Sequence, residues 1–379
     1  PHGGFVNTTR IIGAVALATT AALTLGACAT SETPASGVDA STATSIADFG
    51  SFEALEEAAK AEGALNVIAL PRDWANYGEI LDLFIERYPE ITVTEAAPDA
   101  SSAEEIQAAE NLRGQDTAPD VFDLGLAVAL QSTDYFAPYF VERWDDIPAE
   151  LKHPDGLFWA DYGGYMAIGY DPDAVPAPTS LEDLLGEEYR GKVAINGDPT
   201  QAGAAFAAVG LATVQNGGTL DDFSAGIDFF EQLNAVGNFV KIDPTPATVA
   251  SGETPVVFDW DYLNNGYAAD LDGQRNWEVV VLPGTGYAGY YNQAINVDAP
   301  NPAAARLWME FLYSPEVQNL WLKGGARPAL EASMVANGEI DQALYAALPA
   351  APEDTVVPTA AQSEAAAALL GERWAAAVQ

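Results

Sequence analysis

Four neighbouring residues at the end of a predicted strand carry side chains well suited to binding a small molecule. Asp259, Trp260, Asp261 and Tyr262 close an apolar run that begins at residue 255. Because side chains alternate along a strand, we expect the two aspartates on one side and the two aromatic rings on the other. Ligands of open α/β sheets collect at strand ends of this kind. Carboxylates beside aromatic rings suit an organic cation, which they hold by charge and by cation–π contacts.

Similar side chains recur at other predicted strand ends and near the segments expected to cross between two domains. Asp198 and Thr200 precede a predicted helix, whose free backbone N–H groups are able to hold an anion. Any single ring is a possible core residue and any single acid a possible helix cap, but the set favours a ligand site. The predicted ligand-binding residues are Arg72, Asp73, Trp74, Asp123, Asp161, Tyr162, Asp198, Thr200, Asp259, Trp260, Asp261, Tyr262, Tyr290, Tyr291 and Asn292.

The sequence argues against a cofactor, a metal centre and nucleophilic catalysis. Residues 284–289 match the G-x-G-x-x-G pattern of dinucleotide sites, but an extended segment follows where a helix is required. We therefore interpret these glycines as a bend between lobes. No G-x-S-x-G pattern occurs, and His153 is the only histidine beyond the N-terminal segment. A Ser-His-Asp triad and a zinc site are both disfavoured on this count.

One enzymatic alternative stays open. Asp259 and Asp261 are two residues apart, which places their Cβ atoms ~7 Å apart on one strand. Paired acids at such a separation serve carbohydrate hydrolases, which also use aromatic walls. Turnover of a sugar, rather than simple binding, distinguishes this alternative from a binding protein.

The N-terminal segment resembles that of a bacterial lipoprotein. Arg10 precedes an uncharged apolar run over residues 11–25, which is short for a membrane span and typical of a signal peptide. Leu25-Gly26-Ala27 then precedes Cys28, the sole cysteine, as in a lipobox. We expect a signal peptide over residues 1–27, lipid attachment at Cys28, and hence anchoring at the outer face of the cell membrane. Residues 28–46 are small and polar and predict a flexible tether.

The charge of the chain is strongly one-sided. Lys and Arg number 15 against 55 Asp and Glu, a formal net charge of −40. Such a surface repels nucleic acid and anionic lipid headgroups. We interpret most of this charge as a solvated surface, and we expect no nucleic-acid partner.

Helical and strand patterns alternate along the chain, which is typical of α/β proteins. The length beyond the tether fits two domains. We predict helices over residues 52–61, 77–88, 103–113, 201–214, 223–233, 302–313 and 363–378, the last interrupted at Gly371. We predict strands over residues 64–70, 91–94, 120–125, 192–196, 255–260, 279–282 and 294–297.

The stretch from Asn301 to Gln318 reads N-P-A-A-A-R-L-W-M-E-F-L-Y-S-P-E-V-Q and is followed by Gly325-Ala326-Arg327-Pro328. Both resemble motifs of the extracellular solute-binding proteins of ABC importers, in the branch with ferric-ion, polyamine, thiamine and phosphonate binders. The resemblance covers residues 47 to about 345. It implies a two-lobed type II periplasmic-binding-protein fold with two crossover strands, an ABC permease as partner, and no catalysis. We expect lobe I over 47–163 and 284–379, lobe II over 164–283, and a monomer.

The resemblance leaves the ligand open. Ferric-ion binders place adjacent tyrosines where this chain has Asp261-Tyr262, so one phenolate is missing. Polyamine binders carry Trp-x-Asp where this chain has Tyr290-Tyr291-Asn292, so an amide replaces the acid. Our preferred prediction is an organic cation such as a polyamine. Ferric iron, or an anion or phosphonate held by Arg72 and helix N-termini, remain alternatives.

Overall fold

The computed structural model describes residues 38–379, apart from residues 272, 349–351 and 353. Cys28 and the expected signal peptide lie outside these residues. Within the described part of the chain, no helix is both long enough and apolar enough to cross a membrane. The strands are β1 (Ala64–Ile68), β2 (Thr92–Ala96), β3 (Val121–Gly125), β4 (Phe136–Ala137), β5 (Trp159–Tyr170), β6 (Val193–Ile195), β7 (Val256–Trp260), β8 (Glu278–Val280), β9 (Thr285–Asn296), β10 (Arg327–Pro328) and β11 (Asp354–Val356).

Helices cover both groups of strands. The α-helices are α1 (Ile46–Phe49), α2 (Phe52–Glu62), α3 (Tyr77–Arg87), α4 (Ser102–Asn111), α5 (Leu126–Gln131), α6 (Gly203–Gln215), α7 (Ser224–Ala235), α8 (Pro246–Ser251), α9 (Asp261–Asp270), α10 (Pro302–Leu312), α11 (Pro315–Lys323), α12 (Glu331–Asn337), α13 (Gln342–Ala347) and α14 (Ala360–Ala377). Short 3-10 helices are η1 (Ala40–Thr42), η2 (Thr133–Tyr135), η3 (Trp144–Asp146), η4 (Ala149–Leu151), η5 (Glu182–Leu185) and η6 (Glu187–Tyr189).

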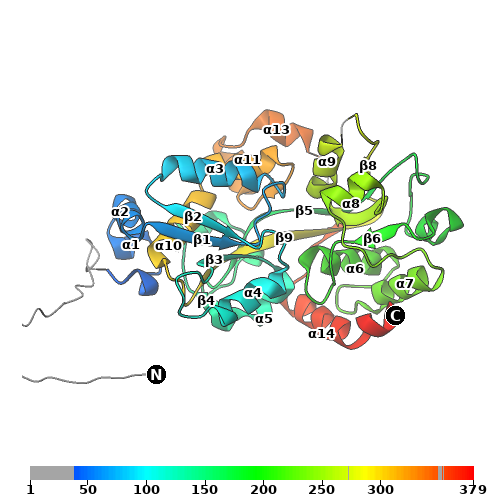
Figure 1. The fold of residues 1–379 in the computed structure, drawn as a ribbon, viewed down its shortest axis with the longest axis horizontal. Helices are drawn as coiled ribbons and strands as arrows, with labels where there is room; N and C mark the ends of the chain where they lie inside the picture. The colour runs from blue at the N-terminus through cyan, green and yellow to red at the C-terminus, as the bar shows by residue number, and fades with distance from the viewer. Residues whose placement is uncertain (1–37, 272, 349–351, 353) are drawn as a thin grey trace, which may run out of the picture. The chain divides into compact units, whose positions relative to one another are not determined.

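Two long antiparallel strands, β5 and β9, join the two lobes (Figure 1). β5 pairs with β9 and β10 over its first half and with β7 and β8 over its second half. The exchange of partners falls between Gly163 and Met166, close to the predicted boundary at residue 163. This is the two-lobed α/β architecture that the sequence indicated, with crossover strands of a kind that permits hinge motion.

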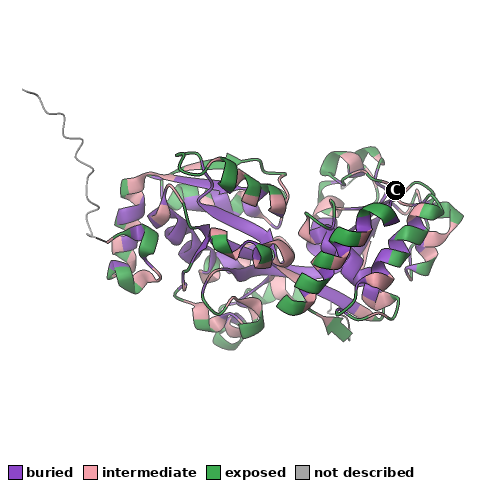
Figure 2. Cartoon of the chain, turned by 90° about the horizontal axis from the view of Figure 1, so that it is seen from below, coloured by how far each residue is buried: buried purple, intermediate pink, exposed green. Residues whose placement is uncertain are grey.

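Lobe I is built from both ends of the chain. Its strands β3 and β4 pair antiparallel with the end of β9, and β1 pairs in parallel with β2. The amphipathic helix α2 packs against α10, and it ends at Gly63 in a left-handed conformation, as the sequence predicts. In the second lobe, α6 packs against the strands β6 and β7, and α7 packs against α6. Buried residues fill both lobes and continue along the joining strands (Figure 2).

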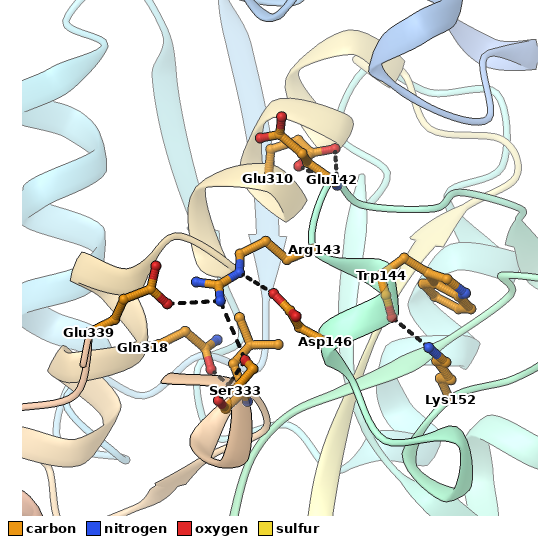
Figure 3. Close-up of polar contacts among 10 residues, drawn as sticks. Glu142, Arg143, Trp144, Asp146, Lys152, Glu310, Gln318, Ser333 and Glu339 are labelled. Atoms are coloured by element: carbon orange, nitrogen blue, oxygen red, sulfur yellow. Dashed lines mark hydrogen bonds and ion pairs between the residues drawn. The ribbon is translucent and has the colours of Figure 1, made fainter. Parts of the chain in front are cut away.

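The segment that leads into β5 is fastened to the later part of lobe I. Arg143 donates to Asp146 at 2.6 Å and contacts Glu339 at 2.9 Å and the hydroxyl of Ser333 at 3.3 Å (Figure 3). The neighbouring backbone N–H of Glu142 donates to Glu310 of α10. The contacts of Arg143 with Ser333 and Glu339, and of Glu142 with Glu310, hold together two stretches of lobe I that are more than 160 residues apart in the sequence.

The structure corrects the predicted end of the tether. Residues 38–46 are ordered, with η1 inside this span and with Ala40 and Ala43 buried. Arg306 of α10 donates to the carbonyl oxygens of Ala43 at 2.7 Å and Ser41 at 3.1 Å. This stretch contributes to the core of lobe I, because a buried guanidinium satisfies its backbone carbonyls.

Two further expectations were wrong. Residues 285–289, which we interpreted as a bend, belong to the continuous strand β9. Helix α14, which we placed in lobe I, packs against α7 of lobe II as well as α5 of lobe I. It also runs unbroken through Gly371, where an added methyl group would meet nothing within 4 Å.

Candidate functional site

A cavity with a volume of about 870 Å³ lies between the lobes. We call it the front cleft. Lobe I contributes the loop after β1, the segment from Pro98 to the first turn of α4, and the end of β3. Lobe II contributes residues 195–198 and 201–204, residues 239–247 and one side of α9.

A second cavity of about 430 Å³ shares some of its lining residues with the front cleft. We call it the back cavity. Helix α5, the start of α6, part of β9 and the first turns of α14 line it, together with residues 150–154. Gln201, Ala202, Gly203 and Tyr291 line both cavities and therefore form the wall between them.

The structure places five of the predicted ligand residues in the front cleft: Asp73, Trp74, Asp123, Asp198 and Tyr291. Thr200, Trp260, Tyr290 and Asn292 line the back cavity, and Tyr291 reaches both. The predicted set is therefore divided between two cavities rather than gathered around one.

The remaining predicted residues line neither cavity. Arg72 points away and pairs with Asp82 at 2.9 Å and with Glu95 at 2.7 Å. Asp161, Tyr162, Asp259, Asp261 and Tyr262 are buried. The expected alternation of Asp259 to Tyr262 stops at Trp260 because α9 begins at Asp261 and turns the chain away from the strand.

A buried hydrogen-bonded cluster supports the floor of the front cleft. Tyr77 and Tyr162 both donate to Oδ2 of Asp123, at 2.8 and 3.0 Å. The indole of Trp74 donates to the Tyr162 hydroxyl at 2.7 Å. Burial raises the pKa of Asp123, and the two phenol hydrogen bonds offset part of this rise. The cluster thus fixes Trp74 at the cleft through one chain of hydrogen bonds.

Other buried acids surround this cluster. Glu105 accepts from the backbone N–H of Asp123 at 3.0 Å, and burial raises its pKa well above the usual range. Asp161 accepts from Gln293 at 2.8 Å, and burial and the neighbouring Asp123 raise its pKa. Buried carboxyls this close together favour sharing protons over full ionisation.

Asp259 and Asp261 are structural in this geometry. Asp259 accepts from Asn196 at 2.9 Å and from the backbone N–H of Trp260, and burial raises its pKa to about 7. Asp261 accepts from the backbone N–H groups of Tyr165 and Tyr262, each at 3.0 Å, and burial raises its pKa to about 6. Neither carboxyl lines a cavity where a sugar could reach it.

Four exposed carboxylates line the front cleft without a side-chain hydrogen bond or ion pair to the described residues. Asp73 and Asp99 belong to lobe I, whereas Asp243 and Asp270 belong to lobe II. Lys241 is the only Lys or Arg among the described residues that line this cleft. Each lobe therefore presents two free negative charges to the space between them.

Aromatic rings accompany these charges. Trp74 meets Tyr291 edge to face, with ring centroids 5.7 Å apart. Phe239 and Tyr267 line the same cleft from lobe II. Burial and the charges of Asp259 and Asp73 raise the pKa of Tyr267. The front cleft is thus lined by both aromatic rings and carboxylates.

Sequence reasoning missed the segments around Asp99, Asp243 and Tyr267. Two local signals were available. Ser101 and Glu104 form a capping box at the start of α4, and Thr245 caps α8 just before Pro246. Both signals mark helix starts at the cleft. Within the described residues, no three His, Cys, Asp or Glu side chains are grouped so as to hold a metal ion.

Comparison with known proteins supports a binding function. Residues 118–348 match the model of a family described as bacterial extracellular solute-binding protein. None of the curated proteins matches the chain.

Solved structures share the fold at low identity. The periplasmic binding protein AfuA from Actinobacillus pleuropneumoniae, with fructose-6-phosphate bound, has a TM-score of 0.66 at 17% identity, covering 83% of this chain and 98% of that one. An ABC transporter substrate-binding protein from Bradyrhizobium japonicum has a TM-score of 0.64 at 16% identity, covering 84% and 100%. Iron-bound HitA from Pseudomonas aeruginosa has a TM-score of 0.59 at 18% identity, covering 82% and 98%. One fold thus serves very different solutes.

Proposed function

Because this chain belongs to the family of bacterial extracellular solute-binding proteins, we propose that it captures an organic polycation in the front cleft for an ABC permease. Family members act outside the cytoplasm and bind solutes rather than convert them. The hydrolase alternative is therefore set aside.

The proposal of a cationic ligand rests on the distribution of unpaired carboxylates in the front cleft. Asp73 and Asp99 face the front cleft from lobe I, and Asp243 and Asp270 face it from lobe II. Like charges on both sides of a narrow cleft repel one another, so the empty protein disfavours closure. A ligand with two or more ammonium groups cancels this repulsion and makes charge-assisted hydrogen bonds to both lobes.

The aromatic lining supports the same ligand class. Trp74, Tyr267 and Tyr291 line the front cleft. Aromatic rings in such a lining suit the methylene chain of a polyamine and make cation–π contacts with its ammonium groups. Closure removes water from these charges, which strengthens each interaction. The ligand then shifts the population of conformers towards the closed state.

A calorimetric screen tests this proposal. The panel contains spermidine, putrescine, 4-aminobutyrate, fructose-6-phosphate and ferric citrate, titrated into wild type and into the double variant Asp73→Asn/Asp270→Asn. We expect spermidine to bind and the double variant to bind it at least about tenfold more weakly, a loss of about 1.4 kcal/mol. Binding of fructose-6-phosphate without binding of either polyamine would contradict the proposal.

An anionic solute is the second candidate, and a specific feature favours it. Helix α6 starts at the front cleft, and its N-cap residue Ala202 has no side chain to satisfy the first N–H groups. Lys241 supplies a positive charge to the same cleft. If fructose-6-phosphate binds in the screen, Lys241→Gln should weaken it, whereas spermidine should bind this variant slightly more tightly.

We also propose that Cys28 carries the lipid anchor, on the sequence signal alone. Mass spectrometry of the membrane-extracted protein should show a lipid adduct at this residue. An unmodified thiol in that material contradicts the anchor and leaves the solute-binding proposal untouched.

A further inference from the structure

Two glycines from different lobes touch backbone to backbone. Gly125 ends β3 of lobe I, and Gly203 begins α6 of lobe II. A Cβ atom on Gly125 would lie 2.9 Å from the Cα of Gly203, and a Cβ atom on Gly203 would lie 3.1 Å from the Cα of Gly125. Even one methyl group at this point therefore overlaps the main chain of the opposite lobe.

The local backbone does not explain either glycine. Gly125 has φ −61° and ψ 142°, which any residue adopts, and Gly203 is not among the glycines with positive φ. Glycine is needed at this point because of the close approach between the two lobes.

The contact lies beside the shared strand that joins the lobes. Gly125 is opposite Tyr291 of β9 in the sheet, and the hydroxyl of Ser102 accepts the N–H of Gly125 at 3.0 Å. Gly203 lies in the wall between the front cleft and the back cavity. Both glycines are thus held on rigid elements close to the strands about which the lobes must turn.

A contact close to a hinge, such as that between Gly125 and Gly203, acts as a pivot (fulcrum) for the rotation of the two lobes. A small displacement there becomes a larger one at the outer edges of the cleft, because those edges lie farther from the joining strands. Close-packed interiors do not absorb an added methyl group by compression. A small rotation of one lobe against the other is enough to relieve an overlap of this size.

We propose that the Gly125–Gly203 contact is the fulcrum on which the lobes close, and that the missing side chains set the closure angle. The proposal does not depend on which solute the protein binds. It predicts that an added methyl group at either position opens the cleft. At Gly125 the nearest atoms to the added methyl group belong to Gly203 and Ser102, so the effect there does not involve a proposed ligand-binding side chain.

Pulsed electron–electron resonance tests the proposal without a ligand. Spin labels are placed at Glu86→Cys on α3 and Glu231→Cys on α7, both exposed, in a full-length Cys28→Ser background. Gly125→Ala and Gly203→Ala are compared with Gly266→Ala. Gly266 also lines the front cleft, but an added methyl group there meets nothing within 4 Å. Melting temperatures are measured on the same samples.

We expect a shifted and broader distance distribution in Gly125→Ala and in Gly203→Ala, and the parent distribution in Gly266→Ala. Melting temperatures should change little, since rotation relieves the overlap. Gly125→Ala is the cleaner variant, because a methyl group on Gly203 also approaches the Tyr291 hydroxyl at 3.2 Å. An unchanged distribution in both variants overturns the proposal. So does a large fall in melting temperature with an unchanged distance, which would mean that the lobes cannot rotate about this contact.

Discussion

The front cleft and the back cavity border the same wall but differ in chemistry. Eight Asp and Glu residues line the front cleft against one lysine, whereas Glu150 and Lys152 are the only acid and the only Lys or Arg among the described residues that line the back cavity. Alanine, glycine, leucine and aromatic side chains make up most of the rest of the back cavity. This difference agrees with our two proposals, in which the charged residues of the front cleft bind the solute and the lobes turn about the contact between Gly125 and Gly203.

Helix α14 connects the two regions, and a substitution in this helix should have the largest effect on stability. Its first turns line the back cavity, and Trp374 near its end packs against Phe230 with ring centroids 5.5 Å apart. Trp374→Ala should lower the free energy of unfolding by about 3–5 kcal/mol, because it removes a large buried ring. Urea denaturation measures the loss.

The matched control lies on the same helix. Gly371→Ala adds a methyl group in open space and should raise the free energy of unfolding by about 0.5–1 kcal/mol. If Trp374→Ala lowered the free energy of unfolding no more than a surface substitution does, the packing of α14 would not contribute to the stability of the two regions.

The buried acids beneath the front cleft predict a pH dependence of a definite sign. Burial raises the pKa of Asp259 to about 7 in the folded protein, whereas an unfolded aspartate has a pKa of about 4. Its protonation therefore favours the folded state. This stabilisation is full below about pH 4 and is lost as the pH rises to about 7.

Asp259→Asn should remove this dependence. The difference in melting temperature between pH 4.5 and pH 7.5 should be smaller in this variant than in wild type. Asp134→Asn, at an exposed position, should leave the difference unchanged. Parallel pH profiles of wild type and Asp259→Asn would contradict the assignment.

The smallest expected effect on stability comes from a comparison of two buried tyrosines, Tyr162 and Tyr262. The hydroxyl of Tyr162 joins Trp74 to Asp123, whereas the buried hydroxyl of Tyr262 has no hydrogen-bond partner among the described residues. Tyr162→Phe should lower the free energy of unfolding by about 1–3 kcal/mol, because it leaves Trp74 without an acceptor. Tyr262→Phe should be neutral or stabilising. Equal effects in chemical denaturation would contradict the hydrogen-bond chain.

The alternating pattern of the sequence was enough to predict the α/β class and seven of the 14 α-helices among the described residues, whereas the two-lobed arrangement was implied by the family resemblance. It was not enough for residues 285–289, where glycines suggested a bend. These glycines serve close packing within a strand: a Cβ on Gly286 would lie 2.5 Å from Pro352, and one on Gly289 would lie 2.5 Å from Trp260. Such contacts come from distant sequence and leave no local signal.

The candidate site was only partly predictable for a similar reason. Strand-end reasoning found Asp73, Trp74 and Asp123, which line the front cleft. It also selected Asp259 and Asp261, because a local pattern does not reveal that a helix starts at Asp261. Asp99 and Asp243 lie in loops of different lobes that line the same cleft, so no local sequence pattern relates them.

The central claim is that the free charges of the front cleft, rather than the overall charge of −40, recognise the solute. Calorimetry with spermidine tests it directly in two variants that each lose four negative charges. One replaces Asp73, Asp99, Asp243 and Asp270 by asparagine. The other replaces exposed Glu86, Asp134, Glu231 and Glu364, which line neither cavity, by the matching amides.

The account predicts that the cleft variant loses spermidine binding by about a hundredfold or more, about 2.8 kcal/mol, while the surface variant stays within a few-fold of wild type. Equal losses in the two variants, or tight spermidine binding by the cleft variant, would contradict it.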